Sequence, residues 1–275
     1  MSAHIHADEA AGLPEYEVYA VKYATRPARR ADNFIGGDPH DQPMPLDYYV
    51  WVVRNAQRLY LIDTGFAQDM ADKRHRQLLR TPAQALELLG IKAEDVAEIV
   101  ITHLHNDHVG TFDAWPNARF HLQDAEMDFA TGRNMCCTVF SRPYEPDHVA
   151  GMIRLVYKNR VVFHDGDAEI GPGVSLHRIG GHTAGMQAVR VHTARGWLVL
   201  ASDASHFYEH FETGRCFTLA FHVGDVLQGY ARLNELADSE HHIIPGHDPE
   251  VLHRYPPAGK ELEGIAARLD LLPKN

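Results

Sequence analysis

The chain has 275 residues, of which 45% are hydrophobic and 23% are charged, as in an ordinary soluble globular protein. Its 37 acidic and 26 basic residues give a formal net charge of −11, which argues against nucleic acid and anionic membrane as partners. No apolar run approaches the roughly 20 residues that span a bilayer, and residues 1–9 lack the pattern of a secretory signal. Three cysteines, two of them adjacent, are no disulfide framework, so a cytoplasmic location is expected.

Predicted strands and helices alternate without a clean linker, which favours one α/β domain over residues 1–275. The side chains of residues 15–24 alternate in the pattern of a β-strand. Residues 26–45 are rich in proline, glycine and aspartate and predict a long loop that could cover a site. Residues 48–53 and 59–62 predict the two strands of a hairpin. Thr81, Pro82 and Gln84 predict a capped helix start, and Gly90 can end that helix. The other predicted strands span residues 99–101, 119–122, 161–163, 174–178, 188–191, 197–200 and 242–244. Helices are predicted over residues 147–157 and 225–237, the second with an apolar face formed by Val226, Leu227, Tyr230, Leu233 and Leu236.

The chain contains 20 histidines, and their distribution indicates a metal site. Four candidate ligands occupy six positions directly after predicted strand 99–101, namely His103, His105, Asp107 and His108. The first two point the same way from an extended strand end, and the other two fall on the following turn. This arrangement can hold two metals side by side, and imidazole with carboxylate suits Zn and also Mn, Fe or Co.

Three further candidates follow an apolar strand or occupy a glycine-rich turn, namely His182, Asp203 and His247. Taken singly, each would more often be a structural turn residue. The same placement three times, together with the first cluster, favours ligands. The neighbouring glycines allow the backbone to approach a metal closely.

This ordered set resembles the metallo-β-lactamase superfamily, in which an HxHxDH motif is followed by His, Asp and His, and residues 61–65 match its upstream turn. The resemblance implies a four-layer αβ/βα sandwich with two Zn²⁺ ions at its edge. Carried over by position, one zinc would be bound by His103, His105 and His182, the other by Asp107, His108 and His247, and both by Asp203. Asp63 would orient the ligands through hydrogen bonds.

Within the superfamily, residues 200–205 and 245–248 look like the N-acyl homoserine lactonase group. That likeness implies a metal-dependent hydrolase that opens a small-molecule lactone, in quorum quenching, by attack of a metal-bridging hydroxide. Two residues depart from the group: His206 replaces a Tyr thought to contact substrate, with Tyr208 two positions later, and Asn106 replaces an apolar residue. A lactone from catabolism of an aromatic or heterocyclic compound therefore stays open, as does a glyoxalase II-like thioester hydrolase.

The catalytic candidates are Asp107, Asp203, His206 and Tyr208, with Asp203 passing a proton to the leaving ring oxygen. A single-iron redox enzyme on the same fold and a non-catalytic metal-binding module are the rival functions. A homodimer is compatible with the sequence. Packing in the core or a pocket is expected for Cys136 and Cys137, and core positions for the tryptophans at 51, 115 and 197. Surface positions are expected for His4, His6, His40, His75, His241 and His242.

Overall fold

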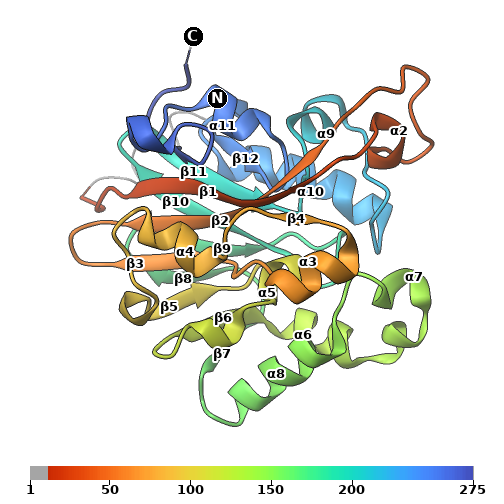
Figure 1. Ribbon diagram of the computed structural model, residues 1–275, viewed down its shortest axis with the longest axis horizontal. Helices are drawn as coiled ribbons and strands as arrows, with labels where there is room; N and C mark the ends of the chain where they lie inside the picture. Colours follow the sequence, from red (N-terminus) through yellow and green to blue (C-terminus); the bar gives the residue numbers. More distant parts are fainter. Residues whose placement is uncertain (1–11, 275) are drawn as a thin grey trace.

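The computed structural model describes residues 12–274, in which two β-sheets pack face to face with helices on their outer sides (Figure 1). The strands are β1 Glu17–Arg26, β2 Leu46–Arg54, β3 Leu59–Ile62, β4 Gln77–Leu78, β5 Glu98–Val100, β6 Arg119–Gln123, β7 Val161–His164, β8 Ala168–Gly171, β9 Val174–Arg178, β10 Gln187–Thr193, β11 Gly196–Ser202, β12 Ile243–Pro245 and β13 Ala266–Arg268. The α-helices are α2 Arg30–Asn33, α3 Gln68–Arg74, α4 Pro82–Glu87, α5 Asn106–Val109, α6 Asp124–Thr131, α7 Thr138–Ser141, α8 Pro146–Val156, α9 Tyr208–Thr213, α10 Val223–Leu236 and α11 Glu250–Arg254.

The larger sheet has eight strands, in the order β13-β1-β2-β3-β5-β6-β7, with β4 paired to β1. Strands β3, β5, β6 and β7 run parallel, so their carboxyl ends lie at the same edge. Both faces of β5 are covered, because Ile99 packs toward the outer helices while Val100 lies in the core between the sheets. Such two-sided burial explains the uninterrupted apolar run in the sequence.

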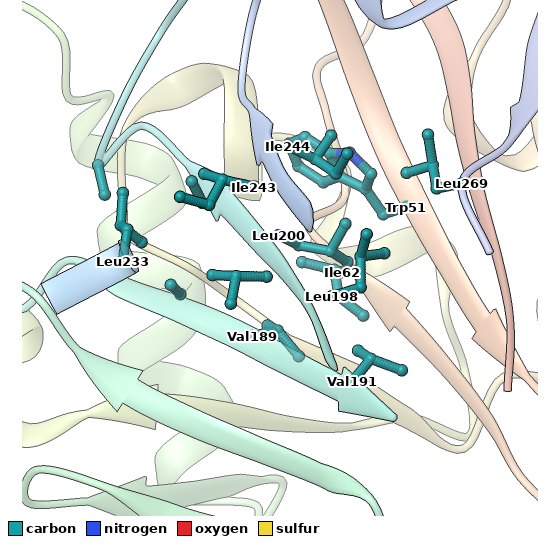
Figure 2. Close-up of a cluster of buried hydrophobic side chains, with 14 of the residues drawn as sticks. Trp51, Ile62, Val189, Val191, Leu198, Leu200, Leu233, Ile243, Ile244 and Leu269 are labelled. Carbon is teal, nitrogen blue, oxygen red and sulfur yellow. The ribbon is translucent and has the colours of Figure 1, made fainter. Parts of the chain in front are cut away.

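The smaller sheet has five strands, in the order β12-β11-β10-β9-β8, and its inner face forms the central core with the larger sheet. Figure 2 shows Trp51 and Ile62 of the larger sheet close to Leu198 and Leu200 of the smaller one. Helix α10 covers the outer face of the smaller sheet and contributes Leu233 to the same cluster. The expected four-layer αβ/βα sandwich is therefore confirmed.

Most of the strands and helices that the sequence predicts begin and end within one or two residues of the predicted bounds. The β2–β3 hairpin is present, and Thr81 and Gln84 form the predicted capping box of α4. The loop at residues 26–45 contains the short helix α2, which the sequence did not predict. The three tryptophans are buried as expected.

Three side-chain expectations were wrong. Leu227 is 42% exposed, because it lies about 100° around α10 from Val226 and so falls outside the buried stripe. Cys136 and Cys137 are both exposed, because they lie in a surface segment, at the end of the turn Arg133–Cys136, in which residues 136–139 are all exposed. His242 is half-buried rather than at the surface, while His40, His75 and His241 are exposed. The expectations for residues 1–9, including His4 and His6, lie outside the described residues.

Between residues 12 and 274, none of the helices is both long enough and apolar enough to cross a membrane.

Candidate metal centre

The HxHxDH motif lies where the parallel strands of the larger sheet end. Strand β5 stops at Val100, and His105 is the N-cap residue of α5, which begins at Asn106. The chain therefore turns sharply between His103 and His108, which lets residues of one short segment face a common point. All four candidate ligands of the motif are buried.

Asp63 connects this turn to the end of the neighbouring strand β3. Its carboxylate accepts hydrogen bonds from the backbone nitrogen of Thr102 at 2.8 Å and from the Thr102 hydroxyl at 2.8 Å. The same carboxylate lies 2.7 Å from Nδ1 of His108. Asp63 thus fixes the orientation of one candidate ligand, as the resemblance implied.

The other three candidate ligands come from the smaller sheet. His182 follows β9, Asp203 follows β11 and His247 follows β12, so the ends of three strands meet the β3–β5 edge of the larger sheet. Gly246 allows this approach, because a Cβ atom at that position would lie 2.6 Å from Oδ1 of Asp203. The structure therefore brings together all seven ligands expected from the sequence.

The first group consists of His103, His105 and His182. Nδ1 of His105 lies 3.0 Å from Nε2 of His103 and 2.9 Å from Nε2 of His182, and the two Nε2 atoms are 3.2 Å apart. Ligands of a tetrahedral zinc ion, at bond lengths near 2.0–2.1 Å, lie about 3.3 Å from one another. The three nitrogens are spaced as a single metal ion requires.

The second group consists of Asp107, His108 and His247, and Asp203 lies between the two groups. Oδ2 of Asp203 is 3.4 Å from Nε2 of His182, while its Oδ1 is 3.4 Å from Nε2 of His108 and 3.0 Å from Nε2 of His247. Nε2 of His247 also lies 3.2 Å from Oδ2, so this one carboxylate is within reach of both groups.

The hydrogen-bond partners of His182 and His247 indicate which nitrogen of each ring faces the cluster with a free lone pair. The outer nitrogens of His182 and His247 lie 2.7 Å and 2.9 Å from the carbonyl oxygens of Leu219 and Asp47, to which they must donate because a carbonyl only accepts. When these imidazoles are neutral, the other nitrogen of each ring has no proton. Nε2 of His108 and Oδ1 of Asp203 are buried without a well-formed hydrogen bond. Burial alone would lower the pKa of His108, but the carboxylates of Asp203 and Asp63 raise it well above the usual range.

The residues present fit a pair of metal ions. Burial lowers the pKa of His182 to about 3 and, with the neighbouring imidazoles, lowers the pKa values of His103 and His105 well below the usual range. These rings are therefore neutral, and Nε2 of His182 has a free lone pair for a cation because Nδ1 of the same ring carries the hydrogen that faces the Leu219 carbonyl. A histidine whose outer nitrogen donates to a carbonyl or carboxylate is typical of metal sites.

Arg76 is not one of the candidate ligands, but it forms an ion pair with Asp107 of the second group. Its Nη1 lies 3.1 Å from Oδ2 of Asp107 and donates to Oδ1 of Asn106 at 3.1 Å. Burial alone would raise the pKa of Asp107, but Arg76 and the neighbouring histidines hold it below the usual value. Asn106, one of the departures from the lactonase pattern, is therefore a hydrogen-bond partner of this arginine.

His206 and Tyr208 occupy different places. Nε2 of His206 lies 3.1 Å from Oδ2 of Asp203, its ring stacks on Phe217, and it borders a cavity of about 360 Å³ beside the cluster. Tyr208 begins α9 and borders a separate cavity of about 440 Å³, where Arg254 lies over its ring. The structure brings His206 to the candidate site and does not bring Tyr208 there.

Glu126, at the start of α6, is a site residue that the sequence analysis missed. Its buried carboxylate accepts from the backbone nitrogen of Leu104 at 2.9 Å, the hydroxyl of Tyr144 at 2.9 Å, the hydroxyl of Thr183 at 2.5 Å and the backbone nitrogen of Gly185 at 3.2 Å. It thus joins the His103–His105 segment to the loop that carries His182. No motif indicated this role, because its partners lie 18 to 59 positions away in the sequence.

Comparison with known proteins identifies the family. Residues 44–262 match the family model of the metallo-beta-lactamase superfamily, which covers most of the chain. The chain belongs to the metallo-β-lactamase superfamily. A probable metallo-hydrolase of Mycobacterium tuberculosis is 31% identical over 242 residues, covering 74% of this chain and 72% of that protein. An N-acyl homoserine lactonase of Bacillus cereus is 32% identical over 167 residues, covering 60% of this chain and 61% of that protein.

Solved structures agree on the fold. A quorum-quenching N-acyl homoserine lactone lactonase superposes with a TM-score of 0.72 at 23% identity, covering 86% of this chain and 94% of that one. The resemblance to the superfamily is confirmed, and with it the expectation of a metal-dependent hydrolase. The likeness to the N-acyl homoserine lactonases is a similarity over 60% of this chain.

Proposed function

We propose that this member of the superfamily opens lactone rings with the help of two zinc ions, one held by each of the two ligand groups. The observation that carries the proposal is the convergence of imidazole nitrogens on either side of Asp203, whose carboxylate lies 3.4 Å from both His182 and His108. Imidazole and carboxylate donors at this spacing suit zinc. No Ser-His-Asp arrangement is needed for such a reaction.

Two bound metals would supply a hydroxide nucleophile at neutral pH and polarise the lactone carbonyl. Within the chain, Asp203 is placed to take the hydroxyl proton of the attacking oxygen once that oxygen is bonded to the carbonyl carbon, and to deliver it to the ring oxygen as the C–O bond of the ring breaks. Burial alone would raise the pKa of Asp203, but His247, His108 and His206 lower it well below the usual range, which keeps it an acceptor in the resting site. Asp107 would complete the second ligand group, and its ion pair with Arg76 would keep it a carboxylate.

His206 is the residue we assign to the substrate carbonyl. It borders the cavity beside the cluster, and a neutral imidazole can donate one hydrogen bond to the oxyanion that develops during attack. Burial lowers the pKa of His206, which favours the neutral ring. Its backbone oxygen accepts from the backbone nitrogen of His247 at 2.9 Å, so the loop carrying Asp203 and His206 is tied to the loop carrying His247.

The test is a substrate panel on zinc-loaded protein, with ring opening followed by proton release. The panel contains lactones of different ring size and substituent, a linear ester and a thioester. We expect the highest kcat/KM on a lactone. Turnover of the thioester alone would favour the glyoxalase II-like alternative, and no turnover of any member by protein holding two metals per chain would contradict the proposal.

A further inference from the structure

The cavity beside the ligand cluster is strongly basic although the whole chain is acidic. Four arginines line it, with Asp32 as the one acidic residue among its lining side chains. The arginines come from three separate segments and are Arg26, Arg74, Arg76 and Arg142. In a chain with a formal net charge of −11, this local reversal of sign next to a reaction centre indicates selection of an anionic ligand.

Two of these arginines already form ion pairs or hydrogen bonds with other groups of the protein. Arg76 pairs with Asp107 and lies over the ring of Tyr48, with 4.7 Å between its Cζ and the ring centroid. Arg74 donates to the carbonyl oxygens of Arg142 and Tyr144 at 2.5 Å and 3.1 Å. These two guanidinium groups therefore build the wall and fix its shape.

The other two arginines have no acidic partner among residues 12–274. Nε of Arg26, at the end of β1, is buried without a hydrogen-bond partner, and the Arg142 side chain is exposed and in no ion pair. A buried guanidinium N–H left without an acceptor is costly, and the cost is relieved when an anion accepts a hydrogen bond from it. Arginine forks match carboxylates in a bidentate geometry.

The apolar side of the site leaves little room. A second cavity, bordered by His105, His182, Phe129 and Phe221, has a volume of about 30 Å³ and shares wall residues with the basic cavity. Such a volume holds about two water molecules. A long acyl chain does not fit there, whereas the basic cavity of about 360 Å³ accepts a compact polar group.

We propose that the substrate is a compact lactone that carries a carboxylate, and that Arg26 and Arg142 bind this carboxylate while the ring carbonyl faces His206. This inference rests on the proposed function and names its substrate class. It also gives a reason for Asn106 in the metal-binding motif. The Asn106 amide oxygen accepts a hydrogen bond from Arg76 and holds it at the cavity wall, and an apolar side chain could not accept such a bond.

The experiment compares two lactones that differ in charge and hardly in shape, N-glutaryl homoserine lactone and its terminal carboxamide. Ring opening is measured with zinc-loaded wild type, with Arg26→Gln/Arg142→Ala, and with Arg154→Ala, which removes one exposed arginine outside the cavity. We expect wild type to prefer the carboxylate by about tenfold to hundredfold in kcat/KM, the range of charge-assisted hydrogen bonds. The double variant should lose this preference through a higher KM for the carboxylate lactone, whereas Arg154→Ala should keep both the preference and the wild-type rate on the carboxamide.

Calorimetry with glutarate gives a readout that does not depend on turnover, with metal content and circular dichroism checked for each variant. Binding to wild type that is lost in the double variant and partly restored by Arg26→Lys/Arg142→Lys supports the inference. Equal turnover of the two lactones, or a preference for the carboxamide, overturns the anionic substrate and leaves lactone hydrolysis standing. If neither lactone is opened, the proposed function fails, and glutarate binding that is equal in wild type and the double variant overturns the arginine site as well.

Discussion

Glu126 and Gly185 are in direct contact, and a Cβ atom at position 185 would lie 2.2 Å from the backbone nitrogen of Glu126. The contact presses the loop that carries His182 against the start of α6. The Glu126 carboxylate then accepts from Gly185 and Thr183 on one side and from Leu104 on the other. The spacing of the first ligand group therefore depends on a residue that binds no metal itself.

We expect Glu126→Gln to weaken metal binding by about 10–100-fold, the usual effect of losing a partner that orients ligands. The glutamine amide would present hydrogens to the Thr183 hydroxyl or to backbone donors, so at least one hydrogen bond of the carboxylate is lost. Zinc affinity by competition with a chelator is the measurement. Glu94→Gln, the same change at an exposed position, is the control. Unchanged zinc affinity in Glu126→Gln would show that the first group holds its shape without this residue.

Asp107→Ala should lose activity by several orders of magnitude and retain one metal per chain instead of two. The reason is that Asp107 belongs to the second ligand group alone, while the two hydrophobic cores do not include it. Metal analysis, circular dichroism and turnover are measured on the same sample. Asp113→Ala, an exposed aspartate outside the cluster, should behave as wild type. Activity of Asp107→Ala within tenfold of wild type would show that the second group is not required.

His206→Ala should lower kcat by about 10²–10³, the effect of removing one oxyanion donor. Tyr208→Phe should stay close to wild type, because Tyr208 borders a different cavity and lies under Arg254. Both variants are assayed on the best lactone of the panel. A His206→Ala enzyme within threefold of wild type beside a strongly impaired Tyr208→Phe enzyme would reverse this assignment.

Replacing both Cys136 and Cys137 with Ser should change neither metal content nor turnover. Both side chains are exposed and neither belongs to a ligand group. A thiol reagent should label these two residues in the folded protein and reach buried Cys216 only after unfolding, which mass spectrometry can count. Loss of one bound metal from the double serine variant would assign a ligand role to this segment.

The strands and the ligand set could be predicted because both depend on local signals. Strands such as β5 are apolar on both faces, and the ligands follow strand ends or glycine-rich turns, where spacing alone is informative. Strands β4, β8 and β13 were missed because they have only two, four and three residues, too few to show an alternating pattern. The buried polar contacts of Glu126 join segments far apart in the chain, which no local pattern can indicate.

Two further features required the fold itself. Residues 206 and 208 are two positions apart, but the chain enters α9 between them, so only the three-dimensional arrangement shows which one borders the cluster. The arginines of the basic cavity likewise come from the end of β1, from the end of α3 and the residues after it, and from the segment after α7. They are scattered along an acidic sequence and form a site only when these segments fold together.

The most direct test of the account is a zinc titration of the chelator-treated protein, with lactone opening recorded at each addition. Two intact ligand groups around Asp203 predict that activity is absent without metal and rises to a plateau at two zinc ions per chain. A plateau at one metal per chain, or ring opening by the metal-free protein, would contradict the two-metal site.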